Sequence, residues 1–342
     1  MTAETTGNDV IEVRGAPVIL GLRFRRYGGA ADIPAIVDIT NRANQADKID
    51  EFETVEETAR VFSNLKNSDP YRDMVIVEVD GKPVGHKRVE WWVEHDGTRI
   101  YFHDGQILPE WRGRGLGRAL IRHSEQRLRE IAREEDHPRE PAPLFDVGVN
   151  DIRKGLVELV KSEGYEPTRY FFDMVRPNLE DIPDVLLPEG IQVRPVRPED
   201  YRAIWEADDE AFRDHWGSSE QDEQDFVRWQ NNQYFQPDIW QVAWDGDQVV
   251  GMVCNFILPE ENERFGRLRG YTENISVRRP WRKRGVARAL IARSFQVIKE
   301  RGMREAALSV DAENASGALR LYESLGFRVV KSGTSYRKPV GL

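Results

Sequence analysis

Alternating apolar and polar residues predict strands in two similar places along the chain. The segments "VIVEVDGKPVGH" (75–86) and "WQVAWDGDQVVGM" (240–252) each hold two such runs on either side of an Asp-Gly pair. Side chains alternate between the two faces of a strand, and Asp-Gly is a preferred pair in tight hairpin turns. Each segment is therefore predicted to form a strand, a turn and a second strand.

A helical period replaces this alternation near the C-terminus. The segment "NASGALRLYESLG" (314–326) has apolar residues at positions 315, 318, 319, 322 and 325. Steps of three and four mark one face of a helix. We expect Asn314 to cap its start and Gly326 to follow its end. Strands are expected at 270–277 and 304–310, before this helix.

The patterns occur twice in the same order. "WRGRGLGRALI" (111–121) matches "WRKRGVARALI" (281–291), and the hairpin segments and a preceding helical segment repeat with them. The offset is 170 positions at these arginine-rich phrases and 162 at the later pair Gly164 and Gly326, which indicates an eight-residue insertion in the first copy. The sequence therefore predicts two tandem copies of one mixed α/β (α+β) fold. The expected divisions are a flexible N-terminus at 1–19, a domain at 20–178, a linker at 179–190 and a domain at 191–342.

Composition narrows the possible partners. The chain of 342 residues has a net charge of −10, which argues against general binding to nucleic acids. A local basic patch points instead to a small polyanion, and it consists of Arg278, Arg279, Arg282, Lys283 and Arg284.

Compartment and metal content follow from what the sequence lacks. No apolar run approaches the ~18 residues of a membrane helix, and the polar N-terminus does not resemble a signal peptide, so we expect a cytoplasmic protein without a membrane partner. The single cysteine, Cys254, lies in an alternating run and is expected in a buried strand, with a reactive thiol as the alternative. The six histidines have no metal-ligand spacing, so we expect no metal. The oligomeric state is not predicted.

The arginine-rich phrases share R-x-R-G-x-[GA]-R-A-L-I between a strand and a helix. They do not spell the G-x-G-x-x-G of a dinucleotide-binding loop, and they lack the G-K-[ST] end of a Walker loop. Small residues allow a tight turn whose N–H groups converge at a helix N-terminus, which suits a phosphate group. The alternative is a basic helix start with solvated arginines.

These residues resemble the acetyl-CoA pyrophosphate loop of the GNAT superfamily of N-acetyltransferases. A second segment, residues 314–327, is similar to the later signature of the same family, N-x-x-A-x-x-L-Y-x-x-x-G-F, with one residue of shift. A tandem pair of this size resembles the architecture of mycothiol synthases. The resemblance implies two tandem acyl-CoA-binding domains, with acetyl-CoA as co-substrate and these loop residues binding its phosphates: Arg112, Gly113, Arg114, Gly115, Leu116 and Gly117 in the first copy, and Arg282, Lys283, Arg284, Gly285, Val286 and Ala287 in the second.

The same resemblance implies a direct transfer of the acyl group to a primary amine. Tyr322 would protonate the departing thiolate, with packing on an apolar helix face as its alternative role. Glu273 would remove a proton from the amine, or else it is a solvated strand residue. Asn314 and the main chain of Ile275 and Val277 would contact the pantetheine arm. Strand alternation predicts that Tyr271, Glu273 and Ile275 share one side of their strand.

The sequence does not identify the acceptor molecule. Eleven acidic residues between Glu199 and Asp225 would attract a cationic amine, although a solvated helix face is the plainer interpretation. An aromatic group in the same region would line the acceptor cleft or pack in the core, and it consists of Phe212, His215 and Trp216. The acceptor is a small molecule or a peptide amine, and a mycothiol-synthase-like enzyme would acetylate a cysteinyl amine.

The first copy is expected to be catalytically silent. Val160 stands where the second copy has Tyr322, and counting back from the arginine-rich phrases puts His103 opposite Glu273, with Asp104 beside it. The runner-up is that His103 and Asp104 perform a transfer of their own. A different class of function is a non-catalytic acyl-CoA sensor that binds through both loops and reacts at neither.

Overall fold

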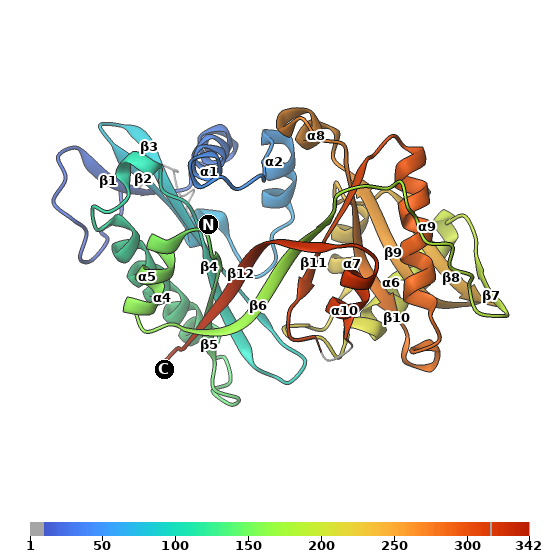
Figure 1. Ribbon diagram of the computed structural model, residues 1–342. Helices are drawn as coiled ribbons and strands as arrows, with labels where there is room; N and C mark the ends of the chain where they lie inside the picture. The colour runs from blue at the N-terminus through green and yellow to red at the C-terminus, as the bar shows by residue number, and fades with distance from the viewer. Residues whose placement is uncertain (1–9, 315–316, 342) are drawn as a thin grey trace. The chain divides into compact units, whose positions relative to one another are not determined.

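The computed structural model describes residues 10–314 and 317–341, and they divide into two compact units. Unit 1 comprises Met1–Thr168 and Thr334–Leu342, and unit 2 comprises Arg169–Gly333 (Figure 1). Most of each unit comes from one sequence repeat. Each unit also includes a short segment of the other repeat: 334–342 in unit 1 and the start of 169–333 in unit 2. The division into domains at 20–178 and 191–342 stays a prediction.

Unit 1 consists of a sheet with helices on both faces. Its sheet follows the order β1-β2-β3-β4-β5 and ends with the C-terminal part of β12. β4 and β5 are parallel, whereas β1, β2, β3 and β4 pair antiparallel. Its elements are β1 (Leu22–Arg26), α1 (Ile33–Asp47), α2 (Val55–Ser63), α3 (Pro70–Asp73), β2 (Met74–Val79), β3 (Lys82–Val93), β4 (Arg99–Asp104), α4 (Leu116–Glu134), β5 (Leu144–Asn150), α5 (Lys154–Ser162) and part of β12 (Arg328–Pro339).

Unit 2 repeats this arrangement. Its sheet follows the order β7-β8-β9-β10-β11 and ends with the C-terminal part of β6. β10 and β11 are parallel, and the other pairs among β6 to β11 are antiparallel. Its elements are part of β6 (Glu166–Arg176), β7 (Ile191–Val193), α6 (Tyr201–Phe212), α7 (Glu223–Gln230), β8 (Gln241–Asp245), β9 (Gln248–Ile257), α8 (Pro259–Phe265), β10 (Arg269–Val277), α9 (Val286–Glu300), β11 (Glu305–Asp311) and α10 (Ala318–Ser324).

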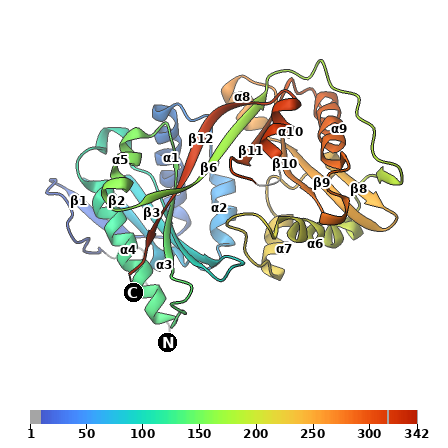
Figure 2. The ribbon, with the colours of Figure 1, turned by 60° about the horizontal axis from the view of Figure 1, so that its bottom comes forward.

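Two apolar layers hold the sheet of unit 2 together. On one face, Leu290 and Phe295 of α9 and Tyr322 of α10 pack against the strands. On the other face, Ile204 and Ala207 of α6 pack on β8 and β9. Figure 2 shows α6 and α7 on the side of the sheet opposite to α9. This mixed α/β arrangement with helices on both faces confirms the predicted fold class.

The predicted hairpins are confirmed, with one correction. In unit 1, Asp80 and Gly81 both have positive φ (50° and 73°), as a type I′ turn requires. In unit 2, Asp245 is the last residue of β8, and the turn consists of Gly246 (φ 55°) and Asp247. The Asp-Gly pair is therefore the turn in the first hairpin only.

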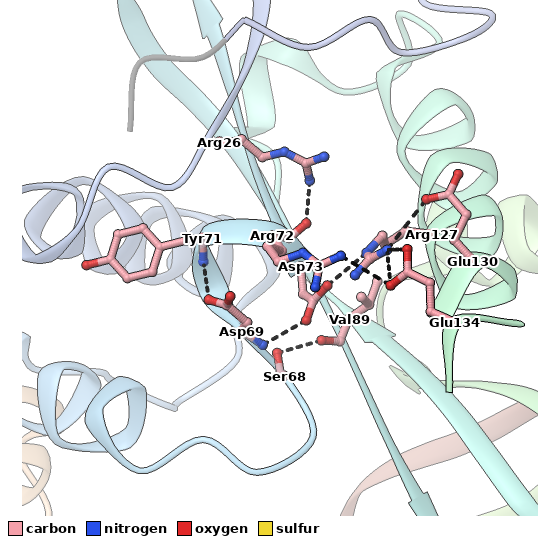
Figure 3. Close-up of polar contacts among 10 residues, drawn as sticks. All are labelled: Arg26, Ser68, Asp69, Tyr71, Arg72, Asp73, Val89, Arg127, Glu130 and Glu134. Atoms are coloured by element: carbon pink, nitrogen blue, oxygen red, sulfur yellow. Dashed lines mark hydrogen bonds and ion pairs between the residues drawn. The ribbon is translucent and has the colours of Figure 1, made fainter. Parts of the chain in front are cut away.

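A buried ion pair joins two elements of unit 1, as Figure 3 shows. Asp73, at the end of α3, accepts a hydrogen bond from Arg127 Nε of α4 at 2.9 Å, and both side chains are at most 10% exposed. Asp73 also accepts from the backbone N–H of Asp69, while Glu134 pairs with Arg127 from the next turns of α4. This cluster fixes the start of β2 against α4.

Candidate active site

Of the two predicted catalytic residues of unit 2, Glu273 lies where β10 and β11 separate. The two strands pair at Arg269–Glu305, Gly270–Ala306 and Tyr271–Ala307. In the described residues they do not pair beyond that point, although β10 continues to Val277 and β11 to Asp311. Beyond that point the two facing edges lack a strand between them in the described part of the chain, and an extended ligand could pair there as an added strand does.

The carboxyl group of Glu273 lies in this gap. Its Oε1 accepts a hydrogen bond from the backbone N–H of Ser309 in β11 at 2.8 Å. Burial raises the pKa of Glu273 to about 8, with a smaller contribution from the neighbouring carboxyl of Asp173 and against the opposing effect of the Ser309 bond. A carboxyl with such a pKa exchanges protons near neutral pH, as a general base must.

Tyr322 lies on α10, in the apolar core that also includes residues of α9. Its side chain is 6% exposed within the core of unit 2, beside Phe327. Burial and the charge of Glu273 raise the pKa of Tyr322 above its usual value, so its hydroxyl keeps its proton. The charge of Glu273 therefore acts on the hydroxyl of Tyr322.

Asp173 is a third ionisable group here, and the sequence did not point to it. It lies on β6 directly opposite Ser309, whose hydroxyl bonds to it. Burial raises the pKa of Asp173. Phe171, two residues earlier on the same face, contacts the ring of Trp216 (centroids 6.0 Å apart). Because β6 follows the first copy in sequence, no comparison of the repeats could have assigned Asp173 to the second.

A one-residue bulge interrupts β10 next to Glu273. Glu273 pairs with Cys254 and Ser276 with Met252, so two residues of β10 stand opposite one residue of β9. The predicted alternation across this segment is therefore wrong: Glu273 and Ser276 share a face, and Ile275 packs on the α9 side. Cys254 is 7% exposed in β9, and burial raises the pKa of its thiol, which confirms the buried-strand interpretation.

The two arginine-rich loops have left-handed residues at equivalent positions. Gly115 (φ 90°) and Gly285 (φ 88°) cap the starts of α4 and α9, where a left-handed conformation favours glycine. Gly113 (φ 72°) and Lys283 (φ 62°) are also left-handed. The side chains just after the caps, those of Leu116 and Val286, are buried, so only their backbone N–H groups are available to a ligand. Gly117 and Ala287 follow them in the first helical turn.

The first arginine of each loop is engaged within the protein. Arg112 donates to the carbonyl of Ile107 (3.1 Å) and to both carboxyl oxygens of Asp47 (2.6 and 3.0 Å). Arg282 likewise donates to the carbonyls of Val277 (2.8 Å) and Ala211 (3.1 Å). Arg114, Lys283 and Arg284 are exposed. These three carry the cationic charge that faces solvent.

The acidic stretch of α6 and α7 is largely paired with arginines. Asp214 bonds Arg279 and Arg282, Glu210 bonds Arg278, and Glu223 bonds Arg202. In the aromatic group, Phe212 and His215 lie together (ring centroids 4.3 Å apart), and Trp216 contacts β6. The acids thus neutralise much of the basic patch.

One helix boundary differs from the prediction. α10 begins at Ala318 with Gly317 (φ 77°) at the N-cap position, whereas Asn314 lies before it in a turn with Asp311. Ala315 lies outside the described residues. Gly326 follows the helix with φ 88°, as predicted.

Unit 1 lacks the tyrosine. The N–H of Tyr165 bonds the carbonyl of Val160 just as that of Phe327 bonds Tyr322, each at 3.1 Å, so Val160 and Tyr322 are equivalent. The counterpart of Glu273 is Asp104 rather than His103, because the bulge of β10 adds one residue between the strand and the loop. His103 is fully buried, and its Nε2 bonds the hydroxyl of Tyr165 at 2.8 Å.

The loop of unit 1 also has a neighbour that the loop of unit 2 lacks. A side-chain carbon built on Gly115 would lie 3.4 Å from Cβ of Pro17, whereas nothing lies within 4 Å of one built on Gly285. Pro17 belongs to the segment 10–20, in which Val13 is buried against the core and Ile11 and Ile19 pack beside it. This part of the predicted flexible N-terminus therefore packs against unit 1, with Pro17 beside Gly115 of the loop.

Neither a metal-binding cluster nor a membrane-crossing helix occurs among the described residues. At 10–314 and 317–341, no group of three histidine, cysteine or acidic side chains is arranged to hold a metal ion. None of the helices in these ranges combines the length and apolar character that crossing a bilayer requires.

Comparisons with known proteins identify the family. The family model "Acetyltransferase (GNAT) family" matches residues 33–135 and 201–327. Mycothiol acetyltransferase from Geodermatophilus obscurus is 28% identical over 270 residues, covering 78% of this chain and 82% of its own length. That of Streptomyces bingchenggensis is 26% identical over 306 residues, covering 88% and 92%.

Solved structures extend the likeness to the fold. A GCN5-related N-acetyltransferase from Sphaerobacter thermophilus superposes with a TM-score of 0.70 at 28% identity, covering 94% of this chain and 97% of its own. A tandem GNAT protein from the clavulanic acid biosynthesis pathway superposes with a TM-score of 0.67 at 14% identity, covering 94% and 99%. The chain belongs to the GNAT family of acetyltransferases and is a tandem member of it, an acyl-CoA-dependent N-acetyltransferase.

Proposed function

We propose that the transfer takes place in unit 2, with Glu273 as the general base and Tyr322 as the general acid. The observation that carries this proposal is the position of Glu273 in the gap between β10 and β11, from which its charge acts on the hydroxyl of Tyr322. The acyl donor would lie in this gap as an added strand, with its pantetheine amides paired to the main chain of Ile275 and Val277 and near Asn314.

The chemistry follows from the two pKa shifts. An acceptor arrives as an ammonium ion, and the carboxylate of Glu273 removes one proton from it, directly or through water. The free amine attacks the thioester carbonyl, and the carbon–sulfur bond breaks. The hydroxyl of Tyr322, which burial keeps protonated, then supplies a proton to the departing thiolate. The nitrogen loses its second proton as the amide forms, and solvent carries that proton back to the oxygen of Tyr322.

The pyrophosphate of acetyl-CoA would lie at the start of α9. Left-handed residues Lys283 and Gly285 turn the backbone so that successive N–H groups converge there. The exposed side chains of Lys283 and Arg284 supply positive charge. Because Arg282 bonds the carbonyls of Val277 and Ala211, we assign it to bracing the loop.

The acceptor is a primary amine on a small molecule or peptide. Because this chain resembles two mycothiol acetyltransferases, we propose a cysteinyl amine as the first candidate among the possible acceptors. Asp173 and Glu273 bring two carboxyl groups to the same site, a setting that favours a cationic acceptor.

The test is turnover with acetyl-CoA and a panel of amines: a cysteinyl amine, a simple alkylamine, an aminoglycoside and a peptide N-terminus. Mass spectrometry of the acetylated product is the readout, because a cysteinyl acceptor carries its own thiol and would interfere with a thiol assay. We expect product with at least one amine, and the cysteinyl amine to give the highest kcat/KM. Tight CoA binding without any product would instead support an acyl-CoA sensor.

A further inference from the structure

The bulge in β10 has an unusual first residue. Asn274 has φ 47°, a left-handed conformation that glycine adopts freely and that asparagine tolerates better than most residues. Together with Ile275, it stands opposite a single residue of β9. A bulge bends its strand and increases the local twist. The bend occurs just after the last pair that β10 forms with β11.

One carboxyl group from α6 holds both sides of this bulge. Asp208 accepts a hydrogen bond from the side-chain amide of Asn274 at 2.8 Å and a second from the hydroxyl of Ser276 at 3.0 Å. Each carboxyl oxygen takes one of the two bonds. The two donors compensate for the burial that raises the pKa of Asp208 to about 6.

Unit 1 provides a natural comparison, because it has neither the bulge nor the carboxyl group. β3 and β4 keep the same register from Arg88–Asp104 to the bridge Gly85–Ile107, so no residue is inserted. Thr40 occupies the position of Asp208 in the repeat and bonds His86 at 3.2 Å. Unit 2 thus has both the bulge and the carboxyl group that braces it. In unit 1, β4 has no bulge at this place and α1 has Thr40 in place of the carboxyl group.

We propose that Asp208 is a positioning residue of the acyl-CoA site, which fixes the bulge of β10 through Asn274 and Ser276. The fixed bulge directs the main chain of Ile275 and Val277 toward the gap, where it can pair with the pantetheine arm. It also sets the direction in which Glu273 leaves the strand. This inference rests on the proposed function of unit 2.

The test separates affinity for the donor from folding. Asp208→Ala removes both hydrogen bonds. Because hydrogen bonds to a charged group contribute more than neutral ones, we expect about a tenfold rise in the KM and in the calorimetric Kd for acetyl-CoA. A role in stability alone would lower the apparent kcat with the folded fraction and leave KM unchanged. Asp208→Asn keeps one acceptor oxygen, so its KM should lie between those of Asp208→Ala and the unmodified protein.

Two further variants sharpen the result. Glycine at position 274 adopts a positive φ without the hydrogen bond to Asp208. Combining Asn274→Gly with Asp208→Ala should therefore restore part of the lost affinity. Thr40→Ala changes the equivalent position of unit 1, and it should leave the affinity for acetyl-CoA unchanged.

The inference is overturned if Asp208→Ala folds and binds acetyl-CoA as tightly as the unmodified protein. It is also overturned if Thr40→Ala weakens binding to the same extent. Failure of the proposed function looks different, because the unmodified protein would then bind acetyl-CoA without forming product, or would not bind it.

Discussion

The protonation of Glu273 should govern how the rate depends on pH. A general base works in its charged form, and burial raises the pKa of this carboxyl from about 4.5 to about 8. The rate is therefore expected to rise with pH and to level off above about pH 8. The hydroxyl of Tyr322 keeps its proton throughout this range, so no loss of rate should accompany it.

The check is kcat against pH for the unmodified protein and for Glu273→Gln. The variant should lose the rising limb and turn over about a hundredfold more slowly. Titration of the acceptor amine is common to both proteins, so their difference reports Glu273. An unchanged limb in Glu273→Gln would assign the ionisation to another group.

At the residue scale, sequence motifs located some groups and could not locate others. Tyr322 and Glu273 follow from motif position. Asp173 and Asp208 do not. Asp173 lies on β6, a strand outside the second repeat, and Asp208 is one of many acidic residues in its segment. A motif reports spacing along the chain, whereas these two contacts depend on pairing across the sheet.

At the scale of elements, the ion pair between α3 and α4 offers a test of stability. Asp73→Ala leaves Arg127 buried with weaker partners, which should lower the free energy of unfolding by about 3 kcal/mol. Arg72→Ala is the matched control (Figure 3): its pair with Glu134 is 59% and 48% exposed, so the change should cost under about 1 kcal/mol. Denaturant unfolding measures both, and equal effects would contradict the assigned importance of burial.

The hairpins and helices were accessible from hydrophobic periodicity, and the bulge was not. A period of two predicts β10 correctly as far as Glu273, but one inserted residue reverses every later side chain. The same inserted residue put the alignment of the two repeats out by one position. The sequence therefore aligned His103, and not Asp104, with Glu273. The repeat showed that the elements recur, while their register became visible only in the sheet.

At the scale of the whole molecule, we predict one acetyl-CoA site per chain. Pro17 packs at Gly115 in the loop of unit 1, whereas Gly285 of unit 2 is open. Calorimetry should therefore count a single site, and Arg284→Ala should weaken it about tenfold through the loss of a charge-assisted contact. Two sites of similar affinity, or a single site unaffected by Arg284→Ala, would contradict this assignment.

The closing strand of each unit is the part of the fold that the repeat could not predict. Residues 334–339 complete the sheet of unit 1, and residues 169–176 complete that of unit 2. Both are ordinary strand sequences, and nothing in their local pattern says which sheet receives them. Their assignment depends on contacts distant in sequence.

The central claim is that unit 2 alone carries out the transfer. Its most direct test is the rate of acetylated product for Tyr322→Phe beside Asp104→Asn, the change at the unit 1 counterpart of Glu273. We predict that Tyr322→Phe lowers kcat about a hundredfold with little change in the KM for acetyl-CoA, while Asp104→Asn keeps the original rate. An unchanged rate in Tyr322→Phe together with a loss in Asp104→Asn would contradict the claim and assign the reaction to unit 1.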